Sequence, residues 1–139
     1  MFYYCVLVTT GNALPPVVSA WSKEALAKAA DPEMDRWHYG TSPYLDFGSS
    51  HFEQVRELWD LRPQMSDDCW RAEYDLRMVA LETALSTLDA EGLFGRGALR
   101  NQLMINVEVV PPDFTNTERA IRLNPRPAIE RWLEEAAEP

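Results

Sequence analysis

The sequence predicts an α+β fold: a small, mainly antiparallel sheet of about three or more strands with a long helix packed on one face. Three runs rich in β-branched and aromatic residues, at 2–10, 16–21 and 103–110, predict the strands. Sustained helical periodicity over 66–89 predicts the helix. The length of 139 residues is that of one domain and 46% of the residues are hydrophobic, so a single domain with one core is expected over 1–139.

The first two strands are predicted to form a hairpin. Residues 2–10 read FYYCVLVTT, an unbroken run typical of a strand buried on both faces, and a Gly-Asn turn signal ends it. PVVSAW at 16–21 follows as the partner strand. Ser22 is placed to cap a helix over 23–30, because a serine hydroxyl accepts a hydrogen bond from the free backbone N–H groups at a helix start.

The middle of the chain is predicted to begin with an aromatic loop. Residues 33–48 mix aromatics with Gly and Pro without a helical or strand period, which indicates an ordered loop. A helix is expected next at 51–61, with Ser49 or Ser50 as its cap and an apolar stripe facing inward. The stripe consists of Phe52, Val55 and Trp59, with Leu58 beside it.

The helix over 66–89 has the clearest periodicity in the sequence. Ser66 is expected to cap its start and Gly92 to follow its last turn, since glycine readily adopts the positive φ of a C-terminal cap. Glu73 and Arg77 are ordered for an i, i+4 ion pair. Its apolar residues recur at intervals of three or four and are Trp70, Tyr74, Met78, Leu81, Leu85 and Leu88.

The third strand, LMINVEVV at 103–110, alternates in polarity. Leu103, Ile105, Val107 and Val109 are expected on a buried face, and Met104, Asn106, Glu108 and Val110 on a partly wet one. Two prolines end the strand because neither can donate to the sheet. A short helix capped by Thr115 or Thr117 is expected to follow, and a last helix at 127–136.

Charge excludes one class of partner. The net charge is -9 and the isoelectric point is near 4.6, so binding to a nucleic acid backbone is not expected. Residues 31–91 hold most of this acidity, with five Arg against fourteen Asp or Glu. The first ten residues lack a secretory signal and their apolar run is too short to cross a membrane, so a cytoplasmic protein without a membrane partner is predicted.

Motifs for catalysis are missing from the sequence. His38 and His51 show no metal-ligand spacing, no phosphate-binding glycine loop follows a strand, and no serine lies in a nucleophile motif. We therefore predict no cofactor, no metal and no catalytic residue, and an enzyme is the less favoured interpretation.

Residues for binding a protein are easier to find. Trp and Tyr with a polar rim are common anchors of interfaces, and the aromatic loop opens the acidic middle of the chain. Polar residues near the end of the third strand are the other candidates. The predicted partner-binding residues are Trp37, Tyr39, Tyr44, Asp46 and Phe47 in the loop, with Asn106, Glu108 and Asp113 at the strand.

The order of several motifs resembles that of a family of small bacterial cytosolic proteins with a domain of unknown function. FYYCVLVTT, RWHYGTSPY, LDAEGLFG, the strand ending in VVPPD, and RAIRLNP carry the resemblance, which covers nearly the whole chain. Genes of that family are often found beside polymorphic toxins, alongside immunity proteins of the SMI1/KNR4 type. The resemblance implies an immunity role and assigns no catalytic residue.

These observations predict a cytosolic, immunity-type protein-binding module. It would neutralise a cognate toxin domain or another basic partner by covering its surface. One alternative is a small hydrolase or transferase using the 46–53 region, where Asp46, His51 and Glu53 lie close in sequence. Another is a scaffold subunit that oligomerises through an exposed edge strand.

Overall fold

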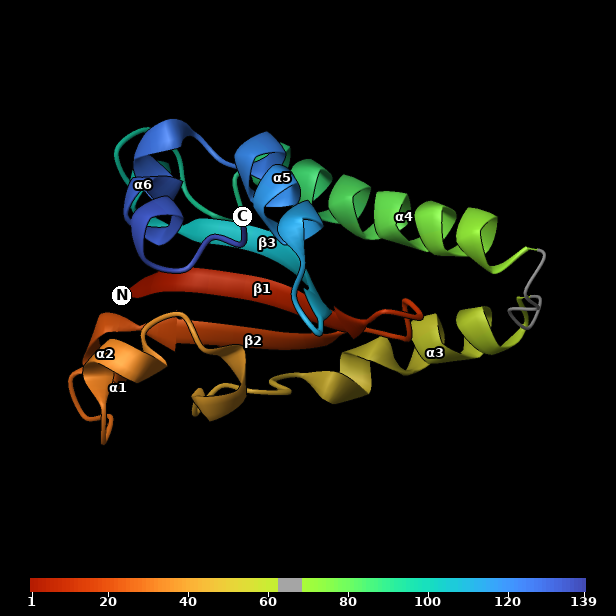
Figure 1. Cartoon of the computed structure of the whole chain (residues 1–139), viewed down its shortest axis with the longest axis horizontal. Coiled ribbons are helices and arrows are strands. Elements are labelled where there is room, and N and C mark those ends of the chain that lie inside the picture. The colour runs from red at the N-terminus through yellow and green to blue at the C-terminus, as the bar shows by residue number, and fades with distance from the viewer. Residues whose placement is uncertain (63–68) are drawn as a thin grey trace.

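A three-stranded sheet lies at the centre of the molecule (Figure 1). The computed structural model describes residues 1–62 and 69–139. Strands β1 (Phe2–Thr10), β2 (Val17–Ser22) and β3 (Met104–Val110) are arranged in the order β2-β1-β3. The α+β class, the three strands and the long helix are confirmed.

Strand pairing is mixed rather than mainly antiparallel. β1 and β2 form the expected antiparallel hairpin, whereas β1 and β3 run parallel. The difference arises from the connection, because the helices between β2 and β3 return the chain to the end of the sheet where β1 begins (Figure 1).

The helices differ from the sequence prediction mainly at their ends. Ser22 caps α1 as expected, accepting from Ala25 N at 3.1 Å, but that helix is shorter than 23–30. The cap predicted at Ser66 lies outside the described residues. The described helices are α1 (Lys23–Leu26), α2 (Pro32–Asp35), η1 (Tyr39–Thr41), η2 (Ser49–Phe52), α3 (Glu53–Asp60), α4 (Trp70–Glu91), η3 (Arg100–Gln102), α5 (Phe114–Leu123) and α6 (Arg126–Glu135). None of the helices within the described ranges is long and apolar enough to cross a membrane.

Helix α4 and the C-terminal helix α6 contribute to apolar clusters on opposite faces of the sheet. On one face Met78, Leu81 and Leu85 of α4 are buried with Ile105 and Val107 of β3. On the other face residues of α6, α1 and the aromatic loop surround Tyr4, Val6 and Met104. Gly92 follows α4 with φ +92°, the left-handed conformation expected of a glycine cap.

The face of β3 predicted to be partly wet is covered. Met104 and Asn106 are fully buried, and Glu108 and Val110 are partly buried. The prediction was wrong because alternation in one strand does not show what later parts of the chain will cover. Here Ile129 and Trp132 of α6 pack on that face.

A buried ion network joins α3 to α4. The predicted pair is confirmed, since Arg77 Nε lies 2.8 Å from Glu73 Oε1, and both side chains are buried. Arg62, just after α3, adds a bidentate contact to the same carboxylate at 2.6 and 2.7 Å. The Arg77 guanidinium also lies 5.0 Å from the centre of the Trp59 ring. These contacts hold the two helices together beyond the end of the sheet (Figure 1).

Helix α5 covers the outer edge of β3 with hydrogen-bonding side chains. Asn116 accepts from Val109 N at 2.8 Å and donates to Val109 O at 3.2 Å, and Arg119 Nε donates to Val107 O at 2.7 Å. Asn124, at the end of the helix, makes the same pair of bonds with Ile105 N and O. The edge thus has its backbone groups satisfied without a further strand, which removes the support for oligomerisation through β3.

The cap of α5 also differs from the prediction. Asp113, not Thr115 or Thr117, is the N-cap, and its carboxylate accepts from Thr115 N at 2.9 Å. The Thr115 hydroxyl donates to the same carboxylate, so this threonine is already inside the first turn. Aspartate is as good a cap as threonine and stands directly after the two prolines, which the sequence prediction overlooked.

Candidate functional site

Trp37, the first candidate in the aromatic loop, is an internal contact. Its ring meets Tyr3 and Tyr4 edge-on, with centroid distances of 5.4 and 5.9 Å. Its indole Nε1 donates to Glu135 Oε2 of α6 at 2.8 Å. The side chain therefore ties the loop to the C-terminal helix and exposes only part of its surface.

Tyr39 and Tyr44 are also partly buried. Tyr39 stacks on His38 with centroids 5.6 Å apart, and its carbonyl accepts from the Ser19 hydroxyl at 2.8 Å. Tyr44 packs edge-on against Phe2 at 5.2 Å. Both tyrosines hold the loop to the sheet, so they support a binding surface more than they form one.

Asp46 and Phe47 lie at the exposed part of the loop. Phe47 is 72% exposed, and Asp46 is exposed as well. Asp46 adopts φ +59°, a left-handed conformation that aspartate tolerates better than most residues. Its backbone N–H donates to Val18 O of β2 at 2.8 Å, which fixes the loop against the outer edge of that strand.

Further exposed apolar side chains follow on α3. Leu58 and Leu61 are 63% and 84% exposed, although the sequence placed Leu58 beside the inward stripe. Four carboxylates accompany them, and none forms a salt bridge within the described part of the chain. We call this region the apolar–acidic surface; it comprises Leu45, Asp46, Phe47, Glu53, Glu57, Leu58, Asp60 and Leu61.

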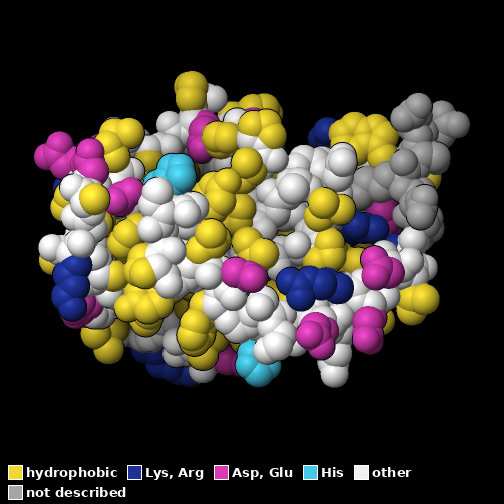
Figure 2. Space-filling view, turned by 90° about the horizontal axis from the view of Figure 1, so that it is seen from below, with side chains coloured by type: hydrophobic (Ala, Val, Ile, Leu, Met, Phe, Trp, Pro, Cys, Tyr) yellow, Lys and Arg dark blue, Asp and Glu magenta, His cyan; other side chains and the backbone are white. Residues whose placement is uncertain are grey.

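Figure 2 shows one face of the molecule. The view is from below, the side on which α3 and the loop before it lie in Figure 1. Hydrophobic side chains are exposed across it, and acidic side chains lie between them together with some basic ones. The sequence missed Leu58 and Leu61 as candidates because a leucine near an amphipathic stripe is expected to be core. In the structure Trp59 packs against the core and these two leucines are exposed.

Asn106 does not lie on a surface at all. It is 0% exposed, and its Nδ2 donates to Asn116 O at 3.0 Å. Its Oδ1 is buried without a hydrogen bond from any described residue. The predicted role in partner binding needs an accessible amide, so the structure contradicts the placement on which that prediction was based.

Glu108 is likewise turned inward. The Tyr4 hydroxyl donates to its Oε2 at 2.8 Å, and burial together with the nearby Glu138 carboxylate raises the pKa of Glu108 to about 7. Tyr4 is itself buried, and burial raises the pKa of its hydroxyl well above 10.0. The hydrogen bond from Tyr4 thus ties this partly buried carboxyl group to the core.

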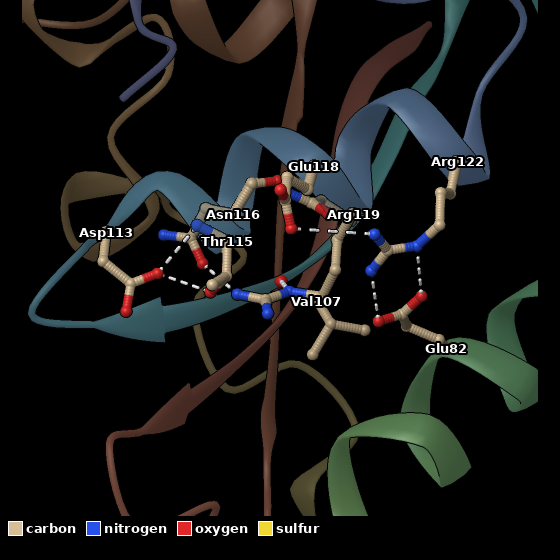
Figure 3. Close-up of polar contacts among 9 residues, drawn as sticks. Glu82, Val107, Asp113, Thr115, Asn116, Glu118, Arg119 and Arg122 are labelled. Atoms are coloured by element: carbon tan, nitrogen blue, oxygen red, sulfur yellow. Dashed lines mark hydrogen bonds and ion pairs between the residues drawn. The ribbon is translucent and has the colours of Figure 1, made fainter. Parts of the chain in front are cut away.

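Asp113 is exposed and lies at a groove between α4 and α5. The groove has a volume of about 450 Å³ and contains both acidic and basic side chains. Arg122 of α5 reaches Glu82 of α4 at 2.9 Å, and Arg119 is buried with its Nη2 donating to Asn116 Oδ1 (Figure 3). These contacts join α4, α5 and the edge of β3, so we assign the groove a structural role.

The residues of the alternative hydrolase site do not form a cluster. Asp46, His51 and Glu53 are all exposed, and their side chains share no hydrogen bond or ion pair among the residues described. In the same part of the chain, no three His, Cys, Asp or Glu side chains are grouped to hold a metal. Burial raises the pKa of the Cys5 thiol to about 11, which leaves it protonated at neutral pH.

No curated protein and no solved structure is significantly similar to this chain. Its motifs predicted membership of a family with a domain of unknown function, and a family model confirms that prediction. The model is described as domain of unknown function (DUF4303) and matches residues 1–125, so the chain belongs to this family.

Proposed function

We propose that the protein is an immunity-type binding module that neutralises a basic partner, such as a cognate toxin domain, by covering its surface. The observation that carries the proposal is the apolar–acidic surface, which combines the exposed Phe47, Leu58 and Leu61 side chains with carboxylates that form no salt bridge in the described chain. The cytoplasm is the compartment in which we expect this binding to occur.

The composition of the surface suits a basic protein. Phe47, Leu58 and Leu61 offer apolar side chains that a partner can bury, and large buried side chains supply most of the affinity of an interface. The unpaired carboxylates of Glu53, Glu57 and Asp60 attract a basic surface and accelerate encounter. Affinity and association rate thus come from different residues of one surface.

The surface is also held in place before a partner binds. Asp46 N is bonded to β2, and Arg56 Nη1 donates to Ser49 O at 3.2 Å, which joins α3 to the turn before it. Phe52 at the end of η2 and Trp59 of α3 pack against the core. A surface ordered in this way loses little conformational entropy on binding.

A quantitative binding assay with the product of the neighbouring gene tests the proposal. Phe47→Ala should raise the Kd about tenfold or more, as expected for a central aromatic anchor. Phe114→Ala, which removes a 56% exposed phenylalanine from α5, is the matched control and should leave the Kd unchanged. The association rate should fall as salt rises, and Glu57→Gln should weaken that salt dependence.

A second readout uses cells. Co-expression of this chain should protect cells from the neighbouring gene product, and Phe47→Ala should reduce protection while Phe114→Ala should not. Absence of both binding and protection would overturn the proposal. So would binding that Phe114→Ala weakens and Phe47→Ala leaves intact.

A further inference from the structure

A pocket separate from the apolar–acidic surface lies where β1 begins. It is bordered by α1 and α2 on one side and by α6 on the other. Helix α3 extends past the other end of the sheet (Figure 1). Its volume is about 480 Å³, within the range of small-molecule sites. Tyr3, Leu26 and Trp37 provide apolar walls.

The charge of this pocket is opposite to that of the protein. Lys23, Arg36 and Arg131 line it, and the described lining includes no Asp or Glu, in a chain with a net charge of -9. Burial raises the pKa of the Tyr3 hydroxyl to about 12. The positive charges of Arg36 and Arg131 act against this rise, and the smaller contribution of Asp35 adds to it. The three cations of the lining favour an anionic ligand.

Arg36 and Arg131 are positioned by a carboxylate and keep further hydrogen-bond donors free for a ligand. Glu135 is not among the lining residues; its carboxylate accepts from Arg131 Nε at 2.7 Å and lies 3.5 Å from Arg36 Nε. No residue in the described ranges accepts a hydrogen bond from the Nη atoms of either guanidinium. The Lys23 ammonium makes no ion pair there either. One carboxylate thus positions two cations without neutralising both of them.

We propose that this pocket binds a small organic anion with an apolar body. The body lies against Tyr3, Leu26 and Trp37, and a carboxylate or phosphate group meets Arg36, Arg131 and Lys23. The two arginine forks suit a flat or tetrahedral oxyanion, since each can donate two parallel hydrogen bonds. This site is independent of the proposed protein partner, whose surface it does not share.

Titration with 8-anilinonaphthalene-1-sulfonate, which has an aromatic body and one anionic group, tests the site. Its fluorescence should report a single site, and the neutral analogue N-phenyl-1-naphthylamine should bind about tenfold or more weakly, since it lacks the charge-assisted bonds. Benzoate and phenyl phosphate should both displace the probe, and the stronger competitor identifies the preferred anionic group. The indole N–H resonance of Trp37, assigned with Trp37→Phe, should shift on binding.

Matched variants locate the binding. Lys23→Gln and Arg131→Gln should each weaken the sulfonate several-fold to tenfold, whereas Lys28→Gln and Arg126→Gln remove nearby cations outside the lining and should have no effect. Lys23→Gln changes an exposed side chain without an ion pair, so it leaves the fold intact. No binding at millimolar probe, equal affinity for the neutral analogue, or equal effects of pocket and control variants would each overturn the proposal. Phe47→Ala should not change the affinity for the probe, so the test of anion binding is separate from the test of protein binding.

Discussion

The partly buried carboxyl group of Glu108, which accepts a hydrogen bond from Tyr4, predicts an unusual dependence of stability on pH. Its ordinary pKa is 4.5, and in the folded protein burial raises the pKa to about 7. Besides Tyr4, which donates to it, the charged groups that act on it are Glu138, which raises the pKa, and Arg119, which lowers it. Between these two pKa values the folded state keeps a proton that the unfolded state has lost.

The sign of the effect follows from this difference in bound protons. Stability falls as pH rises wherever the folded state binds more protons, so the contribution of Glu108 is complete below about pH 4.5 and is lost by about pH 7. A shift from 4.5 to about 7, at about 1.4 kcal/mol for each pH unit, corresponds to a loss of about 3 kcal/mol. That is a large part of the stability of a domain of this size.

Glu108→Gln isolates the effect, because glutamine keeps an oxygen to accept the Tyr4 hydrogen bond and cannot ionise. Urea denaturation followed by tryptophan fluorescence should show the variant gaining about 3 kcal/mol relative to wild type between pH 4.5 and 8. Glu134→Gln, at an exposed position of α6, controls for the loss of one carboxylate. A difference curve for Glu108→Gln that is flat over this range, or that slopes the other way, would refute the reasoning.

Two further predictions concern the hydrogen-bonded and ionic contacts of the helices. Asn116→Ala should lower the free energy of unfolding by about 3 kcal/mol in chemical denaturation, because both backbone groups of Val109 lose their hydrogen-bond partner. The control Glu118→Ala, on the same helix, should change the free energy of unfolding by less than about 0.5 kcal/mol. Arg62 and Arg77 lower the pKa of Glu73 to about 2, so Glu73→Gln should destabilise the protein above about pH 4.5, and the difference from wild type should disappear as pH falls toward 2. Equal effects of Asn116→Ala and Glu118→Ala, or a Glu73→Gln difference that persists at pH 2, would contradict these expectations.

Elements whose signals are local were predictable from the sequence. The strand at Phe2–Thr10 coincides with the unbroken apolar run, and Ser22 and Gly92 serve as caps because their roles depend on the chemistry of one residue and its neighbours. The parallel pairing of β1 with β3 was not predictable in this way. It depends on the path of the chain between β2 and β3, which no strand sequence encodes.

The candidate site shows the same limit for single residues. Asn106 has the polarity of a surface residue, yet its position beneath α5 makes it internal, with its amide bonded to Asn116 O. Leu58 has the polarity of a core residue, yet it is exposed because no other element of the described chain covers its side of α3, whereas its neighbour Trp59 packs against the core. In both cases burial is decided by an element distant in sequence, and local patterning predicts only what a residue would prefer.

The extent of the family match separates the two proposed sites. The apolar–acidic surface lies within residues 1–125, which the family model matches, whereas the organic-anion pocket takes Arg131 and its positioning residue Glu135 from α6. In this chain α6 belongs to the fold, because Ile129 and Trp132 complete the core on one face of the sheet. Protein binding through the loop and α3 is therefore expected of other members that keep an exposed aromatic beside acidic residues there. Anion binding is expected only where a C-terminal helix also brings a cation to the start of β1.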